Sequence, residues 1–466
     1  MRRQRLDRDR TRAHGDAAAA TVTAGYSGHR GHDAAVMVTR IRTPGVLQAR
    51  FGRAMKSLRG PQAVAGTRHA IASDMHRGLM TTGALVLVVA CSSPDTHCEV
   101  KQVVTPSSSR EPGTLQYGVL HSRGLRLGPS LWNAVAARSD GRVVCMTCSG
   151  IVAFDSMLHE TGRVDGAFPV FAVAPDDTVY GLDSGVIIRM ADLDHLSAAS
   201  VQQWPAPVDP RTDIIVAGAE GPYTGTRDYP GVSQSDSVIR GFDAMTGQPR
   251  TVASGQFLLA AEPGGGVLTV EQQGSQAVTL RRLDPSGMVV WSRTLSSTVN
   301  GIGIFGAAVA MDGSMSVIGQ STSGVDFGDR KLDALGWFLA GFDASGATQW
   351  AFHYAGPLGE TSTSIITHIA QTTDGAILIA GQDGAVEGSY PIDSTLTVAT
   401  PAGVVRTLQV GGSGKQTIDG LAAAPDGAVW VYVSSFVDDD VVPDPVLQIG
   451  DHTFADFGEY LFKLVP

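Results

Sequence analysis

Two cysteines three residues apart, Cys145 and Cys148, form the only Cys-x-x-Cys motif of the chain. A structural zinc site would need a second cysteine pair or two histidines at a matching spacing, and the sequence has neither. Redox chemistry would need the first cysteine at a helix N-terminus, whereas this pair lies in a strand-and-turn pattern. We therefore expect a disulfide, either within this pair or between one of the two and Cys98.

Two glycine-rich stretches invite comparison with nucleotide-binding loops. Residues 301–306 spell Gly-x-Gly-x-x-Gly, but a strand pair with an Asp-Gly turn follows where a dinucleotide fold needs a helix. Residues 411–416 read GGSGKQ, with Gln409 six positions before Lys415 and no Ser or Thr after the lysine. The spacing of a phosphate loop is not met, so we expect an inter-blade loop and no cofactor.

The remaining candidate motifs also fall short of a reactive site. Residues 181–185 lack the spacing and the helix of a nucleophile elbow, and the Asp-Phe-Gly of 326–328 recurs at 456–458 as a repeat feature. A Ca²⁺ ion could use the carboxylates of 438–440 and Asp444, but glycine-punctuated ligand spacing is absent. We predict no catalytic residue, no cofactor and no metal site.

The elements that would position any site are short β-type runs. Residues 305–356 contain four of them, GAAVAM, SMSVIGQ, GWFLAGFD and TQWAFHYAG, separated by Asp-Gly, by a polar loop and by Ala-Ser-Gly. Each break is a turn signal, so this stretch predicts one four-stranded antiparallel unit.

The first pair of runs recurs along the chain at intervals of 37 to 62 residues. The seven copies begin at Asn133, Val170, Asp213, Phe257, Gly306, His368 and Gly420. This period is typical of propeller blades with variable outer loops. We predict an all-β fold, with residues 113–466 forming a single β-propeller of about seven four-stranded blades.

The outer halves of the units repeat less faithfully. Asp243, Asp284 and Asp343 occupy the same place at the end of a third run, where a carboxylate can accept hydrogen bonds from the backbone of the turn, so we assign them a structural role. The C-terminal segment 447–466 matches a third run and then stops, while residues 113–124 look like a fourth run. We infer that the N-terminal strand completes the last blade and removes an exposed sheet edge.

Charge divides the chain into two parts. Residues 1–74 carry 14 basic and 5 acidic side chains, whereas residues 91–466 carry 20 basic and 40 acidic ones, a net charge of −20. The acidic body would be repelled by nucleic acid, and the basic leader has no aromatic platform or folded reader beside it. We therefore predict no nucleic-acid partner.

The segment that begins at Met75 has the features of a signal peptide. A short basic start is followed by an apolar run of about 12 residues, which is too short to span a hydrocarbon core of ~30 Å, and by Ala90 and Cys91. Translation is expected to start at Met75 or Met80, which makes residues 1–74 a mis-assigned or disordered leader and 75–90 the signal peptide. The Ser- and Pro-rich segment 91–112 is expected to be a flexible tether.

Two resemblances to known families support this organisation. Val88-Val89-Ala90-Cys91 resembles the bacterial lipobox, which implies that Cys91 carries acyl chains and that the protein is an outer-membrane lipoprotein of the periplasm or the cell surface. The unit 305–356, with VDFGDRKL, GWFLAGFD and QWAFHYAG, resembles the bacterial seven-bladed β-propeller repeat family of secreted and lipid-anchored proteins. That family likeness implies a fold and an address but no activity.

The sequence thus favours a monomeric, lipid-anchored Gram-negative envelope propeller that acts as a binding or scaffold module for an unknown protein or glycan. One alternative is a propeller enzyme such as a lyase, a hydrolase or a quinoprotein, which would bring His, Arg or acidic side chains from three or more blades to the channel mouth. The other is a carbohydrate-binding adhesin, which would expose aromatic side chains near Trp337, Tyr390 and Trp430.

Overall fold

The computed structural model describes Val100–Val104, Leu115–His121 and, with gaps, residues 134–465. The gaps are 148–149, 166–167, 169, 184, 192–200, 207–211, 227–232, 300, 334, 355–364, 383–392, 437–445 and 456–457. The leader, the signal peptide and Cys91 lie outside the described residues. No helix in the described part of the chain is long and apolar enough to cross a bilayer.

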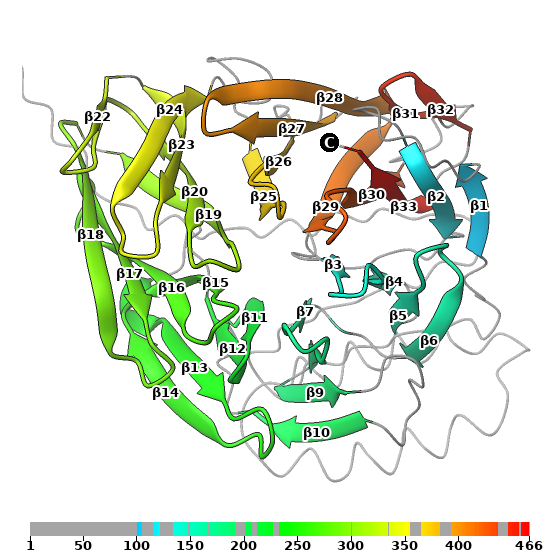
Figure 1. The fold of residues 1–466 in the computed structure, drawn as a ribbon, viewed down its shortest axis with the longest axis horizontal. Helices are drawn as coiled ribbons and strands as arrows, with labels where there is room; N and C mark the ends of the chain where they lie inside the picture. The colour runs from blue at the N-terminus through cyan, green and yellow to red at the C-terminus, as the bar shows by residue number, and fades with distance from the viewer. Residues whose placement is uncertain are drawn as a thin grey trace, which may run out of the picture. The chain divides into compact units, whose positions relative to one another are not determined.

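Seven four-stranded antiparallel sheets form the blades of a β-propeller, as the repeats predict (Figure 1). Blade 1 consists of β3 (Val135–Ala137), β4 (Val143–Thr147), β5 (Gly150–Phe154) and β6 (Glu160–Asp165). Blade 2 consists of β7 (Val170–Val173), β8 (Val179–Asp183), β9 (Val186–Met190) and β10 (Val201–Pro205). Blade 3 consists of β11 (Ile214–Gly218), β12 (Gly221–Gly225), β13 (Val238–Phe242) and β14 (Pro249–Ser254), with the short 3-10 helix η2 (Gln234–Asp236) before β13.

Blades 4 to 7 follow the same order from the centre outward. Blade 4 consists of β15 (Phe257–Ala261), β16 (Val267–Gln272), β17 (Ala277–Leu283) and β18 (Val289–Ser297). Blade 5 consists of β19 (Ile302–Val309), β20 (Met315–Ser321), β23 (Gly336–Phe342) and β24 (Thr348–Tyr354). Blade 6 consists of β25 (Ile365–Gln371), β26 (Ile377–Gln382), β27 (Ser394–Thr400) and β28 (Gly403–Ser413). Blade 7 consists of β29 (Lys415–Ala423), β30 (Val429–Phe436), β33 (Gly458–Leu464) and β2 (Leu115–His121).

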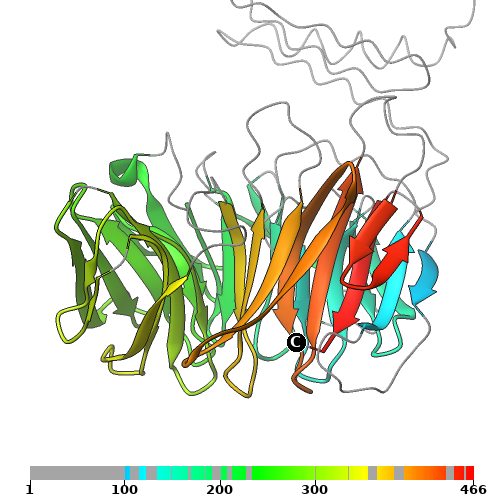
Figure 2. The same cartoon turned by 90° about the horizontal axis from the view of Figure 1, so that it is seen from above.

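The innermost strands close the ring. Each of β3, β7, β11, β15, β19, β25 and β29 contacts the innermost strand of the next blade, and β29 contacts β3 again. Because strands alternate in direction, the connections between strands one and two and between strands three and four of a blade share one end, which we call the turn end (Figure 2). The other connections share the opposite end, which we call the loop end.

Strand β2 joins the two ends of the domain, as the sequence predicts. It pairs with β33 from Leu115 opposite Leu464 to His121 opposite Glu459. Blade 7 therefore takes its outer strand from the N-terminal side of the chain. Val100–Val104, five residues of the segment expected to be a tether, form a further strand, β1, that pairs with the outer side of β2.

Two hairpins extend the outer edges of neighbouring blades. In blade 5 the polar segment between the second and third runs, expected to be a loop, contains β21 (Val325–Asp326) and β22 (Lys331–Leu332), and β21 pairs with β18 of blade 4. In blade 7 the corresponding segment contains β31 (Val446–Ile449) and β32 (His452–Phe454), and β31 pairs with β28 of blade 6. The expected loop is a strand pair because Val325 and Phe327 are both buried.

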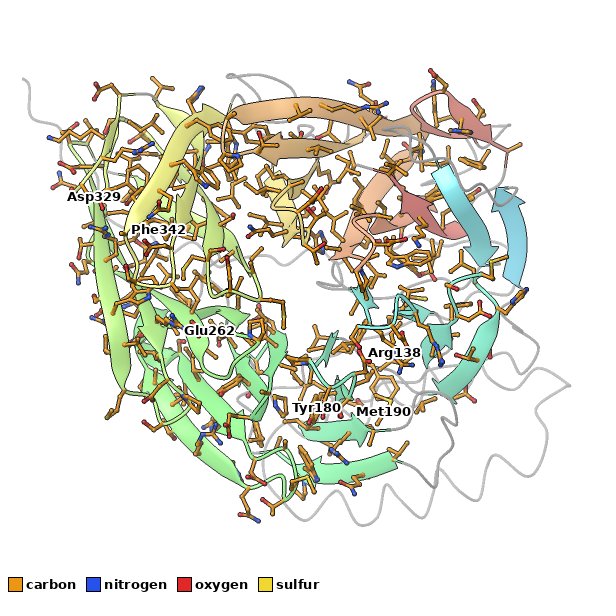
Figure 3. The ribbon with its side chains drawn as sticks, in the orientation of Figure 1. Arg138, Tyr180, Met190, Glu262, Asp329 and Phe342 are labelled. Atoms are coloured by element: carbon orange, nitrogen blue, oxygen red, sulfur yellow. The ribbon has the colours of Figure 1, made fainter. Side chains whose placement is uncertain are left out.

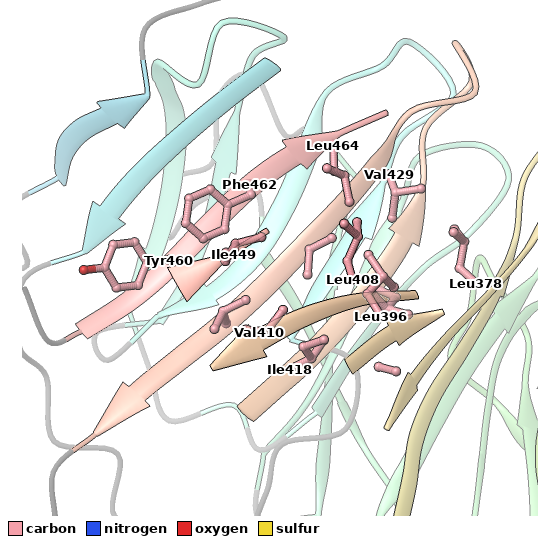
Figure 4. Close-up of a cluster of buried hydrophobic side chains, with 14 of the residues drawn as sticks. Leu378, Leu396, Leu408, Val410, Ile418, Val429, Ile449, Tyr460, Phe462 and Leu464 are labelled. Atoms are coloured by element: carbon pink, nitrogen blue, oxygen red, sulfur yellow. The ribbon is translucent and has the colours of Figure 1, made fainter. Parts of the chain in front are cut away.

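The core lies between the blades. Figure 4 shows the cluster between blades 6 and 7, where Leu396 and Leu408 of one blade face Val429 and Phe462 of the other. Central strands such as β33 are buried along their whole length, since each sheet has a neighbour on both faces. This cluster encloses an apolar void of about 10 Å³, about the room that one water molecule needs.

Candidate functional site

The glycine-rich motifs lie on strands. Residues 302–306 belong to β19, which continues into a hairpin and provides no helix N-terminus for a pyrophosphate. Residues 411–413 end β28 and Lys415 begins β29, so Gly414 alone separates the two strands. The inter-blade loop expected there is thus a single residue between long strands.

The two Asp-Phe-Gly sequences do not occupy equivalent positions. Gly328 lies near the tip of the β21–β22 hairpin, with φ +90°, whereas Gly458 begins β33. When the two hairpins are aligned, Gly328 is equivalent to Gly450. Gly336 is equivalent to Gly458, since Gly336 begins β23 and Gly458 begins β33. The prediction that residues 326–328 and 456–458 are equivalent was therefore wrong. The residues equivalent to 326–328 are 448–450, eight positions before 456–458.

Of the three cysteines considered for the predicted disulfide, the structure describes Cys145. Cys145 is buried in β4, where it pairs with Val135 on one side and with Val152 on the other. Cys91, Cys98 and Cys148 lie outside the described residues, as do residues 438–440 and Asp444. The disulfide among Cys98, Cys145 and Cys148 stays a prediction.

The three repeated aspartates cap their turns, as the sequence predicts. Asp343 Oδ1 accepts hydrogen bonds from Ser345 N (2.9 Å), Ser345 Oγ (2.6 Å) and Ala347 N (3.0 Å). Asp243 and Asp284 accept the same kinds of bond from their own turns. These bonds favour the ionised carboxylate, and the side-chain bond from Ser345 is the largest cause of the lowered pKa of Asp343.

We expect Asp343→Ala to destabilise the propeller in a pH-dependent way. The folded pKa of Asp343 lies below its unfolded value of about 3.9, so its contribution is complete above that value and is lost as pH falls through the folded pKa. Urea unfolding should show a larger midpoint difference between wild type and variant at pH 6 than at pH 3. Asp451→Ala, which removes an exposed carboxylate, is the control. An equal midpoint difference at both pH values would contradict this account.

Arginines link the turns of Asp284 and Asp343 to the preceding blade. Arg250 of β14 donates to Pro285 O (2.8 Å), and Arg293 of β18 donates to Gly346 O (3.0 Å). Arg282 of β17 donates to Ala344 O at 2.7 Å and pairs with Glu262 Oε1 at 2.6 Å. Burial raises the pKa of Glu262, and the bond from Arg282 opposes that shift. These groups are occupied in holding blades together at the turn end.

Asp329 closes a second polar link between blades 4 and 5. Its carboxylate pairs with Arg293 of β18 and accepts a bond from Thr348 N of β24 at 3.2 Å. The neighbouring Arg330 donates to Gln349 O at 3.0 Å. Figure 3 shows Asp329 at the outer rim, far from the central channel. The hairpin β21–β22 therefore braces two blades from outside.

Titratable side chains on the seven inner strands come from two adjacent blades. Within the ranges that the structure covers they are His368 of β25 and Lys415 and Asp419 of β29. Asp419 accepts a hydrogen bond from Ser434 Oγ, and the Tyr432 hydroxyl donates to Glu459 Oε2 at 2.6 Å. Both carboxylates are buried. In the described part of the chain, no group of three or more His, Cys, Asp and Glu side chains could hold a metal ion.

The inner strands of blades 5, 6 and 7 share a β-bulge that the sequence analysis missed. The pairing skips Phe305, Thr367 and Asp419, each of which lies five residues before its turn. The described inner strands of blades 1 to 3 pair without such a shift, and in blade 4 the pairing skips Leu259, which lies closer to its turn. Bulges redirect side chains and are frequent near binding sites. The available signal is the aligned sequence Ile-x-Gly or Ile-x-His, which a single chain shows only weakly.

The aromatic side chains named for the adhesin alternative divide into two groups. Trp337 and Trp430 are buried between blades, and Tyr390 lies outside the described residues. Phe305, at the bulge of blade 5, is 44% exposed. Its ring meets Trp337 edge to face, with the centroids 5.0 Å apart. The inner wall of blade 5 thus presents one aromatic ring to solvent.

Comparison with known proteins identifies no family. No protein-family model matches the chain, and no curated protein matches it. Among solved structures, a chain of the mitotic checkpoint complex is 11% identical with a TM-score of 0.43, and the match covers 83% of this chain and 99% of that one. The Nup133 β-propeller domain of Vanderwaltozyma polyspora is 7% identical with a TM-score of 0.38, covering 78% and 99%. A luciferin-regenerating enzyme is 12% identical with a TM-score of 0.34, covering 61% and 87%.

Proposed function

We propose that this seven-bladed β-propeller is a binding or scaffold module of a bacterial envelope, held at a membrane by lipid on Cys91. The observation that carries the proposal is the closed ring, since β2 and β33 fix the blades as one rigid frame with a loop end and a central wall. A frame of this kind suits recognition by surface loops and inner strands.

The address of the protein rests on the sequence from Met75 to Cys91. A basic start, a short apolar run and a lipobox-like Val-Val-Ala-Cys support export and acylation in a Gram-negative envelope. Buried acyl methylenes contribute about 0.8 kcal/mol each to membrane binding, so lipid on Cys91 would hold the protein at a bilayer surface. The likeness of residues 305–356 to the bacterial seven-bladed repeat family supports the same address.

Replacement of Cys91 tests the anchor. Cys91→Ser should abolish metabolic labelling with palmitate and release the protein from the membrane fraction, because the thiol that accepts the diacylglycerol is gone. Cys98→Ser, seven residues further along, is the matched control and should keep both the label and the membrane fraction. Continued labelling of Cys91→Ser would refute the anchor.

The enzyme alternative can be compared with the titratable side chains on the inner strands. His368 and Asp419 lie on the inner strands of adjacent blades, where that alternative expects contributions from at least three. Reproducible turnover by the purified chain in a screen with metals and a quinone cofactor would favour the enzyme. The glycan alternative is favoured by the exposed ring of Phe305.

A further inference from the structure

Blade 5 exposes two side chains at the loop end of its sheet. Strand β20 is a central strand, and six of its seven residues are buried, but Gln320 is exposed. On the adjacent inner strand, Phe305 is exposed as well. A central-strand position is normally covered by the next blade, so the exposed side chains of Phe305 and Gln320 form a solvent-accessible patch at the loop end of the sheet.

Phe305 and Gln320 lie on the same face of the sheet. Gln320 pairs with Gly303 on β19 and with Trp337 on β23, so the three positions share one face of the sheet. A Cβ placed on Gly303 would lie 3.4 Å from the Phe305 ring, which puts that ring on this face too. Gly303 thus leaves room for the ring beside Gln320.

This face of the sheet is turned toward blade 6. Trp337 packs in one cluster with Ile366 and Ile377 of that blade, so the face it shares with Gln320 is the one turned toward blade 6. Trp337 is 6% exposed, and its ring packs edge to face against the ring of Phe305 at an interplanar angle of 62°. Thr367 occupies the bulge of blade 6 at the level of Phe305. The site therefore lies between the inner ends of blades 5 and 6.

The chemistry of these side chains is neutral. Phe305 offers a flat apolar face, and the amide of Gln320 offers two donors and an acceptor. The side chain of Gln320 is exposed and forms no hydrogen bond with the described residues. Because the body of the protein carries a net charge of −20, anionic ligands such as nucleotides would be repelled.

We propose that this patch, formed by Phe305 and Gln320 over the buried Trp337, binds one pyranose ring of a neutral glycan. The C–H face of the sugar stacks on Phe305, and its hydroxyl groups bond the Gln320 amide. A neutral sugar combines an apolar C–H face with hydroxyls around its edge and carries no charge, so it matches both side chains. The inference deepens the proposed binding function, because it assigns that function a site and a ligand class.

The test is a titration of the full chain with neutral glucose and N-acetylglucosamine oligosaccharides, followed by calorimetry and tryptophan emission. At least one oligosaccharide should bind saturably and change the tryptophan emission of the chain. Phe305→Ala should weaken binding about tenfold through loss of the stacked ring. Gln320→Ala should weaken it about threefold to tenfold through loss of the amide bonds. Phe305→Trp should retain binding.

Met311→Ala is the matched control, because it removes an apolar side chain of blade 5 that is 78% exposed and lies at the turn end. It should leave the affinity unchanged. Binding that survives Phe305→Ala in a folded variant would overturn the site but leave a binding module in place. Failure of every oligosaccharide to bind would overturn the ligand class, whereas loss of the anchor is read separately from palmitate labelling of Cys91.

Discussion

Removal of residues 113–124 should unfold the propeller or drive it to aggregate. The deletion takes away β2, which pairs with β33 at six positions. At about 1 kcal/mol for each net backbone hydrogen bond, the loss is roughly 5 kcal/mol, comparable to the whole stability of many domains. It also exposes the edge of β33, a strand whose seven residues are all buried, and an open edge of that kind templates aggregation. Circular dichroism and size-exclusion chromatography would report both effects.

Proline substitutions distinguish the contribution of β2 to stability from that of β1. Val119→Pro places a proline in β2, which is paired on both sides, and should cost about 3 kcal/mol or more. Gln102→Pro places the same residue in β1, which pairs only with β2 among the described strands, and should cost less than about 1 kcal/mol. Equal melting temperatures for wild type and Val119→Pro would contradict closure of the ring by β2.

Gly247→Ala should destabilise blade 3 by about 2 to 4 kcal/mol. The residue adopts φ +68°, which costs alanine about 1 kcal/mol. A Cβ there would also lie 2.3 Å from Cγ and Cδ2 of Trp204, the indole of blade 2 on which the turn rests. Trp204 is buried beside Tyr180, with the centroids 5.9 Å apart, so it cannot move without disturbing the core, and such overpacking costs about 1 to 3 kcal/mol.

Gly255 provides a closely matched control within the same blade. It has φ +67°, and a Cβ there would meet nothing within 4 Å, so Gly255→Ala should show the backbone cost alone, about 1 kcal/mol. In a Trp204→Ala background, Gly247→Ala should fall to the same value, since the indole is gone. Denaturant unfolding of the four variants measures the coupling. Equal costs for Gly247→Ala and Gly255→Ala would show that the turn does not rest on Trp204.

The repeat made the architecture predictable. The Asp-Gly turns between first and second strands and the aspartates at 243, 284 and 343 mark local backbone geometry, which a sequence records directly. The truncated last unit predicted that the strand near Gly113 completes blade 7, and β2 pairs with β33 accordingly. The structural role assigned to these aspartates is confirmed by the hydrogen bonds that each accepts within its turn.

Features that depend on a neighbouring blade were not predictable in the same way. Residues 325–332 looked like a polar loop because four of the eight are charged, yet Phe327 packs between Phe338 and Phe342 and fixes a hairpin there. The bulge at Phe305 depends on how β19 pairs with β20, and its sequence differs in each blade. The exposure of Gln320 depends on how blade 6 packs against blade 5, so it could not be predicted from the sequence of β20 alone.

The pairing of β2 with β33 also governs when the domain can form. Leu115 and Leu464 are 349 positions apart, so this pairing requires nearly the whole chain to have been synthesised. Contacts of such long range slow folding, because the entropy of bringing distant segments together is lost before the contact stabilises anything. During synthesis, blades 1 to 6 can assemble in succession as an open arc. A chain that ends before Gly458 leaves β2 without its partner, so closure of the ring depends on the seven residues of β33.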